Sequence, residues 1–164
     1  MAGKFNDKVV IVTGGSRGLG RAMSLGFAAE GARVVVASRK IESCESVVRQ
    51  IEGLGGEAFA RAAHMGNLSD IDGLIEAAYA RFGRVDILVN NAGIVRFGAM
   101  EAQSAEDYID VVNVNLLGSC FCAREIAPAM MERGSGHIIN FTSINGIHPA
   151  PGVGLYGPTK AAMA

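Results

Sequence analysis

Short apolar segments alternate along the chain with segments in which apolar residues recur at helical spacing. The apolar segments occupy residues 9–12, 34–36, 57–61, 85–89 and 137–142, of which 57–61 is the weakest. Apolar runs of this length are typical of strands that are buried on both faces. The helical spacing predicts helices over residues 19–27, 41–51, 71–82 and 104–133, and a further helix that begins near Tyr156.

Regular alternation of buried strands and helices predicts an α/β fold. The expected architecture is a Rossmann-type, doubly wound parallel sheet in a three-layer αβα arrangement, with right-handed crossovers. No internal repeat, linker or low-complexity segment interrupts the pattern, so residues 1–164 are interpreted as a single domain. In such folds ligands bind beyond the carboxyl ends of the strands, and functional residues are therefore expected directly after each strand.

The composition excludes several classes of protein. Hydrophobic residues make up 49% of the 164 positions, and 15 Lys+Arg against 16 Asp+Glu give a net charge of −1. A disordered tail would be less apolar and a nucleic-acid-binding module would be basic, so neither is expected. No apolar run approaches the roughly 18 residues of a membrane span, and residues 1–8 lack the apolar core of a signal peptide. We expect a cytoplasmic protein without membrane contact.

The cysteines add little chemistry to this picture. Cys44, Cys120 and Cys122 are an odd number without a C-x-x-C pair. The plain interpretation is free thiols, as in most cytoplasmic proteins, and no metal site is expected. Because Cys120 and Cys122 lie two positions apart on a predicted helix, their side chains should point to different sides.

A glycine-rich segment follows the first predicted strand, with the pattern T-G-x-x-x-G-x-G over residues 13–20. Small residues let backbone N–H groups approach a pyrophosphate at a helix N-terminus, where the helix dipole favours negative charge. The alternative is a tight turn without a ligand. The preceding strand and a helix start near Gly18 favour a dinucleotide-binding domain. The predicted contacts in this segment are Thr13, Gly14, Ser16, Arg17, Gly18, Leu19 and Gly20.

The end of the second predicted strand bears on the choice of cofactor. An NAD site usually carries an acidic residue there, which binds the ribose 2′-hydroxyl. This chain instead has Ser38, Arg39 and Lys40, and Glu42 is the first carboxylate that follows. Together with Arg17, these cations could contact a 2′-phosphate, although surface cations at helix starts are the simpler alternative. We therefore predict NADP(H), with NAD(H) as the second choice.

Four motifs in this order resemble the short-chain dehydrogenase/reductase family over the whole chain. They are the glycine turn, Asn90-Asn91-Ala92-Gly93 after the fourth strand, Asn115 in V-N-L-L-G, and Ser143 ahead of Tyr156-Gly157-Pro158-Thr159-Lys160. The resemblance is to members such as the NADP-dependent 3-oxoacyl reductases. It implies a Rossmann-type fold, a nicotinamide cofactor, and hydride transfer between a secondary alcohol and a carbonyl compound.

The resemblance also implies four catalytic residues. Tyr156 resembles the general acid/base of the family, and Ser143 the residue that hydrogen-bonds the substrate carbonyl oxygen. A free phenol, with a pKa of about 10, is a poor base at neutral pH. Lys160 lies four positions on, where its ammonium would favour the phenolate, and it resembles the lysine that holds the nicotinamide ribose. Asn115 resembles the asparagine that organises a helix kink and a water-linked proton path.

Further cofactor contacts follow from the same resemblance. Where the family often has an aspartate for the adenine amino group, this chain has His64, which can accept or donate a hydrogen bond. The segment after the fourth strand is expected to lie beside the adenosine ribose, where Asn90 and Gly93 position the cofactor. The complete set of predicted contacts outside the glycine turn is Ser38, Arg39, His64, Met65, Asn91, Ala92, Gly93, Tyr156 and Lys160.

Members of the family continue well beyond the position of Ala164. The resemblance therefore implies a C-terminally incomplete domain, truncated after the start of the catalytic helix, and a homo-oligomer, tetramer or dimer, at full length. A nucleotide-binding module without turnover and an isomerase or epimerase are the alternatives to a reductase. Apolar residues in the loops 94–102 and 144–155 suggest an apolar carbonyl substrate of modest size, with a 3-oxoacyl thioester as one candidate.

Overall fold

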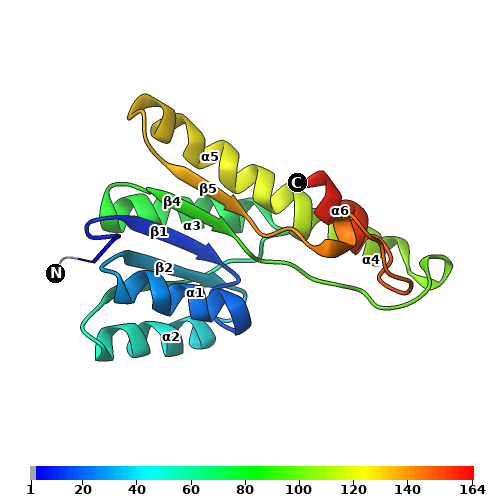
Figure 1. Cartoon of the computed structure of the whole chain (residues 1–164), viewed down its shortest axis with the longest axis horizontal. Coiled ribbons are helices and arrows are strands. Elements are labelled where there is room, and N and C mark those ends of the chain that lie inside the picture. The colour runs from blue at the N-terminus through cyan, green and yellow to red at the C-terminus, as the bar shows by residue number, and fades with distance from the viewer. Residues whose placement is uncertain (1–2) are drawn as a thin grey trace.

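Five parallel strands form the centre of the molecule, as a computed structural model that describes residues 3–164 shows (Figure 1). Their order across the sheet is β3-β2-β1-β4-β5, which confirms the predicted Rossmann-like arrangement. The strands are β1 (Val9–Thr13), β2 (Arg33–Ser38), β3 (Glu57–Ala62), β4 (Ile87–Asn90) and β5 (His137–Asn140). The helices are α1 (Gly18–Ala29), α2 (Ile41–Gly53), α3 (Leu68–Phe82), α4 (Ala105–Val112), α5 (Gly118–Glu132) and α6 (Tyr156–Ala162).

Two apolar layers enclose the sheet because successive residues of a strand face opposite sides. Val9 and Ile11 pack against α3 and α5, whereas Val10 and Val12 pack against α1 and α2. Figure 1 shows these helix pairs on the two faces of the sheet, with α4 and α6 beyond the carboxyl ends of the strands. The predicted three-layer arrangement is thus present, and the apolar faces predicted for 41–51 and 71–82 are the buried ones.

Helix α1 only partly buries the face that its apolar residues predict. Met23 and Phe27 are half-buried against the core, but Leu19 is 57% exposed, and the fully buried residues of the helix are Gly20, Ser24 and Ala28. The reason is distance: a Cβ on Gly20 would collide with the Gly14 carbonyl. Only small side chains fit where α1 lies against the turn before it, so the apolar spacing predicts the helix but not its most buried side.

The helical stretch predicted for 104–133 is continuous but not uniform. Between α4 and α5, residues Asn113–Leu117 form a π-helical segment, η2, whose wider turn is consistent with a kink at Asn115. Such segments are frequent at functional sites. Short 3₁₀ helices, η1 (Met100–Ala102) and η3 (Ile144–Gly146), occur in the loops before α4 and after β5.

A strand is present within residues 137–142, as predicted, but it is shorter than expected and is not buried. β5 ends at Asn140, and all four of its residues are exposed. Within residues 3–164 it pairs only with β4, so it forms one edge of the sheet. Burial on both faces is a property of the inner strands of this sheet.

Other features of residues 3–164 bear on function mainly by what they lack. In this part of the chain no helix is both long and apolar enough to cross a membrane, and no cluster of His, Cys, Asp and Glu could hold a metal ion. The cysteines are free; Cys120 is exposed, while Cys44 and Cys122 are buried. Burial raises the pKa of the Cys122 thiol to about 12, which makes it unreactive at neutral pH.

A buried carboxylate, Asp86, joins the starting ends of β1 and β4. Its Oδ2 accepts a hydrogen bond from the Val9 N–H (3.0 Å), and Oδ1 accepts from Arg84 Nε (3.1 Å) and Nη2 (2.5 Å). Burial alone would raise the pKa of Asp86, but the hydrogen bonds from Arg84 and Val9 outweigh it and lower the pKa. The ionised form is therefore the one that the fold stabilises.

Replacing this carboxylate with an amide should destabilise the protein in a pH-dependent way. We expect Asp86→Asn to lower the free energy of unfolding at pH 7 by about 1–3 kcal/mol, the usual range for a hydrogen-bonded charged group. The contribution is fully present above the unfolded pKa of about 3.9 and is lost as the pH falls through the lower folded value. Urea denaturation at pH 7 and near pH 3 measures this, and an equal difference at both pH values would contradict it.

Candidate functional site

A cleft of about 530 Å³ lies beyond the carboxyl ends of β1, β2, β3 and β4. This is the edge at which a doubly wound sheet binds its ligand. Most of the residues predicted to contact a cofactor line it: Gly14, Ser16, Arg17, Gly18, Leu19, Gly20, Ser38, Arg39, His64, Met65, Asn91, Ala92 and Gly93. Four separate loops thus bring one predicted set of residues to one surface.

The floor of the cleft is the glycine turn between β1 and α1. Gly14 has φ +65°, and a Cβ there would lie 2.9 Å from Asn91 Nδ2. Gly20 has no space for a Cβ because the Gly14 carbonyl lies against it. Helix α1 begins at Gly18, as predicted, so its first N–H groups face the turn. The turn can therefore present backbone donors to an anion without side chains in the way.

Thr13 does not line the cleft, contrary to the predicted cofactor contact. Its hydroxyl donates to the Val89 carbonyl (3.1 Å) and accepts from the N–H groups of Asn91 and Ala92 (both 3.0 Å). Asn91 Nδ2 in turn donates to the Thr13 carbonyl (2.9 Å). These bonds hold the loops after β1 and β4 together, so Thr13 shapes the cleft from below.

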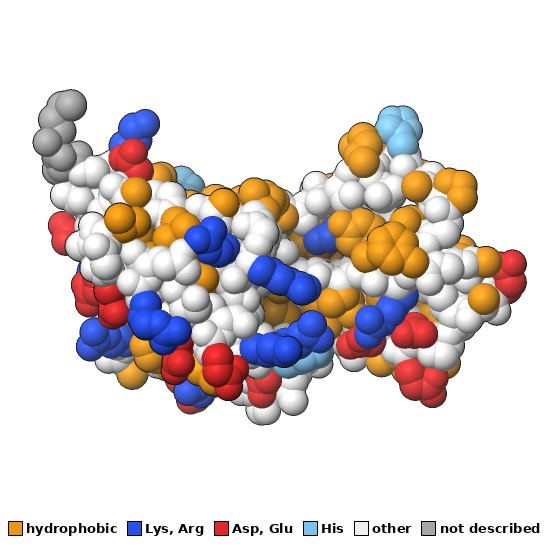
Figure 2. Space-filling view, turned by 90° about the horizontal axis from the view of Figure 1, so that it is seen from below, with side chains coloured by type: hydrophobic (Ala, Val, Ile, Leu, Met, Phe, Trp, Pro, Cys, Tyr) orange, Lys and Arg blue, Asp and Glu red, His pale blue; other side chains and the backbone are white. Residues whose placement is uncertain are grey.

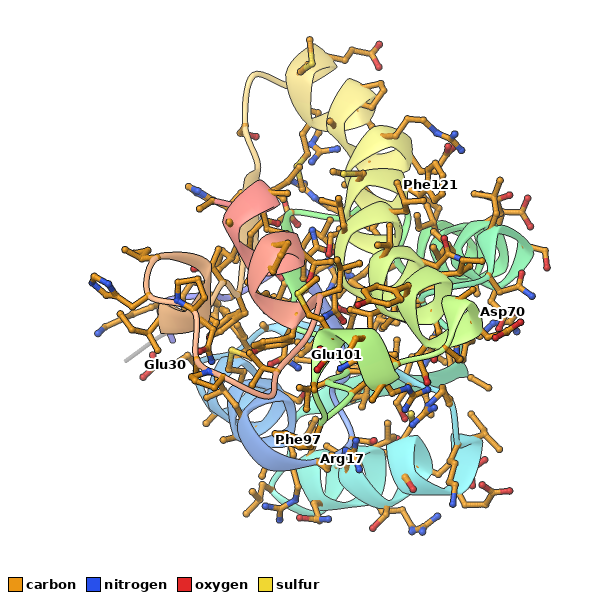
Figure 3. The ribbon with its side chains drawn as sticks, turned by 90° about the vertical axis from the view of Figure 1, so that its right-hand side faces the viewer. Arg17, Glu30, Asp70, Phe97, Glu101 and Phe121 are labelled. Atoms are coloured by element: carbon orange, nitrogen blue, oxygen red, sulfur yellow. The ribbon has the colours of Figure 1, made fainter. Side chains whose placement is uncertain are left out.

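Basic side chains surround one end of the cleft. Arg17, Arg39 and Lys40 line it, and no carboxylate is among the described residues that do. None of the salt bridges within residues 3–164 involves these three cations. Figure 2 shows Lys and Arg side chains around the hollow, and Figure 3 shows Arg17 at the start of α1. This end is suited to bind an anionic group.

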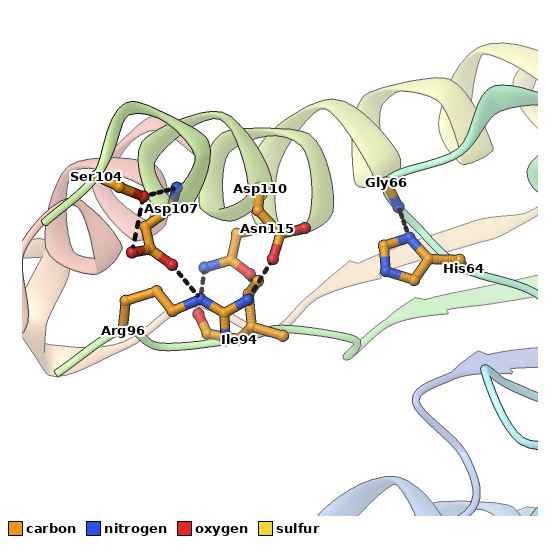
Figure 4. Close-up of polar contacts among 8 residues, drawn as sticks. All are labelled: His64, Gly66, Ile94, Arg96, Ser104, Asp107, Asp110 and Asn115. Atoms are coloured by element: carbon orange, nitrogen blue, oxygen red, sulfur yellow. Dashed lines mark hydrogen bonds and ion pairs between the residues drawn. The ribbon is translucent and has the colours of Figure 1, made fainter.

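His64 lines the cleft directly after β3, and its ring is held in one orientation. Nδ1 accepts a hydrogen bond from the Gly66 N–H (3.1 Å; Figure 4), and the His64 N–H donates to Asp70 Oδ2 (2.8 Å). Nδ1 is therefore the acceptor, and in the neutral ring Nε2 carries the hydrogen. The structure places His64 in the cleft with a donor available for a ligand.

Sequence reasoning missed several residues of the cleft wall. Ser43, Ala63, Ile94 and Val114 line it as well, and Lys40 was named only as a cation beside Arg39. Ser43 lies in the first turn of α2, and Ala63 follows β3 directly, so the rule of strand ends could have found both. Ile94 and Val114 gave no such signal, because their positions depend on how the loop after β4 meets the π-helical segment.

At the other end of the cleft Gly93 lies beside Lys160, a predicted cofactor contact that does not itself line the cleft. A Cβ on Gly93 would be 3.6 Å from Lys160 Nζ, and the lysine itself is only 4% exposed. Its ammonium donates to the Phe141 carbonyl (2.7 Å) and contacts Met163 Sδ (3.7 Å). Phe141 supplies the one oxygen that accepts from this ammonium within residues 3–164. Burial lowers the pKa of Lys160, and hydrogen-bonding capacity remains for a ligand.

Asn115 connects this end of the cleft to α6. Its Oδ1 accepts from the Ile94 N–H (2.8 Å), and its Nδ2 donates to the Ile94 carbonyl (2.9 Å) and to Thr159 Oγ1 (3.2 Å). The Thr159 hydroxyl donates to the Tyr156 carbonyl (2.8 Å). Asn115 is fully buried in the π-helical segment, so its side chain fixes the loop after β4 against the start of α6.

Tyr156 and Ser143 lie on the two elements that pack together beside the cleft, but neither residue lines it. Tyr156 is the first residue of α6, which places Pro158 in the first turn as predicted. The centre of its ring is 5.9 Å from Lys160 Nζ. Ser143 precedes η3, and its Oγ accepts from the Asn145 N–H (3.2 Å). η3 and α6 approach so closely that a Cβ on Gly157 would lie 2.7 Å from the Asn145 carbonyl.

Comparisons with known proteins agree on one family. The short chain dehydrogenase family profile matches residues 8–164. A 3-oxoacyl-[acyl-carrier-protein] reductase of Synechocystis sp. is 39% identical over 95% of this chain and 64% of that protein, and FabG of Thermotoga maritima is 34% identical over 98% and 65%. The crystal structure of a metagenomic short-chain oxidoreductase in complex with NADP superposes with a TM-score of 0.93 at 34% identity, over 97% of this chain and 72% of that one. The chain thus spans slightly less than two thirds of the curated relatives.

Proposed function

Because the chain belongs to the short-chain dehydrogenase family, we propose that it is an NADP(H)-dependent oxidoreductase that interconverts a carbonyl compound and a secondary alcohol. The observation that carries the proposal is the form of the cleft, which has a cationic rim at one end and, at the other, Gly93, against which the buried ammonium of Lys160 lies. A dinucleotide of the NADP(H) type matches both ends: its phosphorylated ribose would lie at the cationic end, and its second, unphosphorylated ribose would lie near Lys160.

The residues present fit such a cofactor. Gly14 and Gly20 form a cradle that added Cβ atoms would disrupt, and the helix N-terminus behind it favours a pyrophosphate. The volume of about 530 Å³ lies within the range of cofactor sites. Arg39 and Arg17 would hold the 2′-phosphate, and Lys160 would hold the nicotinamide ribose. When bound, the cofactor supplies or accepts the hydride.

In this proposal Tyr156 moves the proton at the substrate oxygen. During reduction its hydroxyl donates to the forming alkoxide, and during oxidation the phenolate removes the hydroxyl proton. The Lys160 ammonium lies over the ring of Tyr156 and favours the phenolate electrostatically. Ser143 would donate a hydrogen bond to the substrate oxygen, and Asn115 would keep Lys160 and the start of α6 in register.

For the substrate we propose an apolar carbonyl compound, with a 3-oxoacyl thioester as the class to test first. Apolar side chains in the loops 94–102 and 144–155 are exposed, among them Phe97 and Ile147 (80% and 72%). They would be covered by an apolar ligand. The names of the Synechocystis and Thermotoga relatives support the thioester class. A cofactor that stays bound and unconsumed during turnover would favour an epimerase instead.

The choice between the two nicotinamide cofactors is directly measurable. We expect NADPH to bind at least about tenfold more tightly than NADH, because charge-assisted bonds to a phosphate contribute about 1.5–3 kcal/mol each. Arg39→Ala should remove most of this preference and leave NADH affinity unchanged. Fluorescence titration of both cofactors measures it, with Arg49→Ala on the exposed face of α2 as the matched control. Equal affinities, or tighter NADH binding, would contradict the assignment.

A further inference from the structure

The loop after β4 carries an arginine that is bound to two carboxylates of α4. Arg96 Nε lies 3.0 Å from Asp107 Oδ1, and Arg96 Nη2 lies 2.5 Å from Asp110 Oδ2 (Figure 4). Asp107 is itself fixed, because its Oδ2 accepts a hydrogen bond from Ser104 Oγ (3.0 Å) and its N–H donates to the same hydroxyl (3.1 Å). The guanidinium therefore joins the loop to one face of α4 at two points.

The exposure of these side chains indicates that they contribute little to the stability of the fold and mainly fix the position of the loop after β4. Arg96, Asp107 and Asp110 are 43%, 39% and 33% exposed. Ion pairs this accessible to water contribute about 0–1 kcal/mol to stability. A planar guanidinium with a separate carboxylate on each of two nitrogens nevertheless defines an orientation that a point charge would not. The cluster is thus suited to fix where the loop lies.

The same loop is bonded to the segment that leads into Tyr156. The Gly98 N–H donates to the Gly152 carbonyl (2.9 Å), and Gly98 and Val153 form a parallel bridge. The Val153 carbonyl in turn accepts from the Tyr156 N–H (3.1 Å), which begins α6. The path from Arg96 to the proposed proton donor is therefore a short series of backbone bonds.

Gln103 reinforces this path from the side of η1. Its Nε2 donates to the Arg96 carbonyl (3.0 Å) and to the Gly98 carbonyl (3.3 Å). The side chain of Gln103 also fills the space where a Cβ on Gly154 would be, two residues before Tyr156. The loop after β4 and the loop before α6 thus share one set of contacts.

We propose that Arg96 is a positioning residue for Tyr156: its bonds to Asp107 and Asp110 hold the loop after β4, and that loop holds the segment before α6. The inference rests on the proposed function of Tyr156, but the contacts that support it are not those of the cofactor cleft. Arg96 does not line the cofactor cleft, so its loss should leave cofactor affinity unchanged. It should misplace the phenol relative to the substrate and lower kcat.

The test compares Arg96→Met and Arg96→Lys with Arg49→Met, which breaks an exposed ion pair with Glu45 on α2. In Arg96→Met we expect kcat to fall about tenfold, the NADPH dissociation constant to change less than twofold, and the Gly98 and Tyr156 amides to exchange about two- to fivefold faster. Arg96→Lys should give intermediate values, and Arg49→Met should match the unmodified protein. In addition, kcat of the unmodified protein should fall toward that of Arg96→Met at about 1 M salt, where the screening length is about 3 Å.

Amide exchange keeps this inference separate from the proposed function. Unchanged exchange at Gly98 and Tyr156 in Arg96→Met would overturn the inference whatever the kinetics show, and so would faster exchange with an unchanged kcat. If the unmodified protein reduces no carbonyl compound, the proposed function has failed. The exchange rates would then still decide whether Arg96 holds the segment before α6.

Discussion

Replacing Tyr156 with phenylalanine is expected to lower kcat for carbonyl reduction by about 10²- to 10⁴-fold, the range of a general acid. The substitution removes only the hydroxyl, and the ring that lies 5.9 Å from Lys160 Nζ is kept. Because Lys160 and the residues that line the cleft are unchanged in this variant, the dissociation constant of NADPH should change little. Steady-state kinetics together with fluorescence titration separate the two effects.

A matched control for this substitution is Tyr108→Phe. Tyr108 lies on α4, and its hydroxyl donates to the Met100 carbonyl (2.8 Å) near the same loops, but it has no part in the proposed proton transfer. We expect Tyr108→Phe to keep kcat within a few-fold of the unmodified protein. A Tyr156→Phe enzyme with near-normal turnover would refute the acid/base role, whereas equal losses in both variants would mean that the loops had been disturbed.

Lys160→Met is expected to have the second largest effect, a loss of at least about 10²-fold in kcat together with weaker NADPH binding. The ammonium has two proposed partners, the nicotinamide ribose and the phenolate of Tyr156, and methionine replaces it with a chain of similar length. Both kinetic and binding constants should therefore change, in contrast to Tyr156→Phe. Lys4→Met, at an exposed position near the N-terminus, is the control. Unchanged NADPH affinity in Lys160→Met would contradict the placement of the ribose.

The stability of the same variant tests the burial of Lys160 without any substrate. Burial lowers the pKa of Lys160 in the folded state, so the unfolded chain holds this proton to a higher pH. Between the lowered pKa and the unfolded value of about 10.4, the unfolded state binds more protons, and the stability of the unmodified protein must rise relative to that of Lys160→Met. Contributions that do not depend on pH, such as the packing of the side chain, shift this stability difference by a constant and leave its pH dependence unchanged. A stability difference that is flat up to pH 10 would mean that Lys160 is not desolvated.

Several parts of the fold could be predicted because the relevant signal is local. Helix α3 buries each of Ile71, Leu74, Ile75, Ala78 and Phe82, the residues whose spacing predicted it. Here apolar residues at helical spacing coincide with the face that packs on the sheet. In α1 they coincide only in part, because the close approach of Gly20 to Gly14 demands small residues on the most buried side. Periodicity reports hydrophobicity, and it cannot report how close two elements must come.

The candidate site likewise contains residues that the sequence predicts and residues that it does not. Residues directly after strands, such as Ser38 and His64, could be assigned to the cleft from topology alone. Ile94 and Val114 could not, since they reach the cleft through the bonds of Asn115 to Ile94 across the loop after β4. The contacts of Arg96 with Asp107 and Asp110 were equally hidden. They join residues 11 and 14 positions apart across a loop whose path no residue pattern defines.

The central claim, that this cleft and Tyr156 together carry out hydride and proton transfer, is tested most directly by following the loss of NADPH absorbance with 3-oxoacyl thioesters and a panel of ketones. The account predicts that NADPH is consumed in a one-to-one ratio with the alcohol formed, that NADH supports the reaction poorly, and that Tyr156→Phe binds NADPH but consumes it at least about 10²-fold more slowly. Tight binding of NADPH with no consumption by any carbonyl compound in the panel would contradict it and would identify a nucleotide-binding module without turnover.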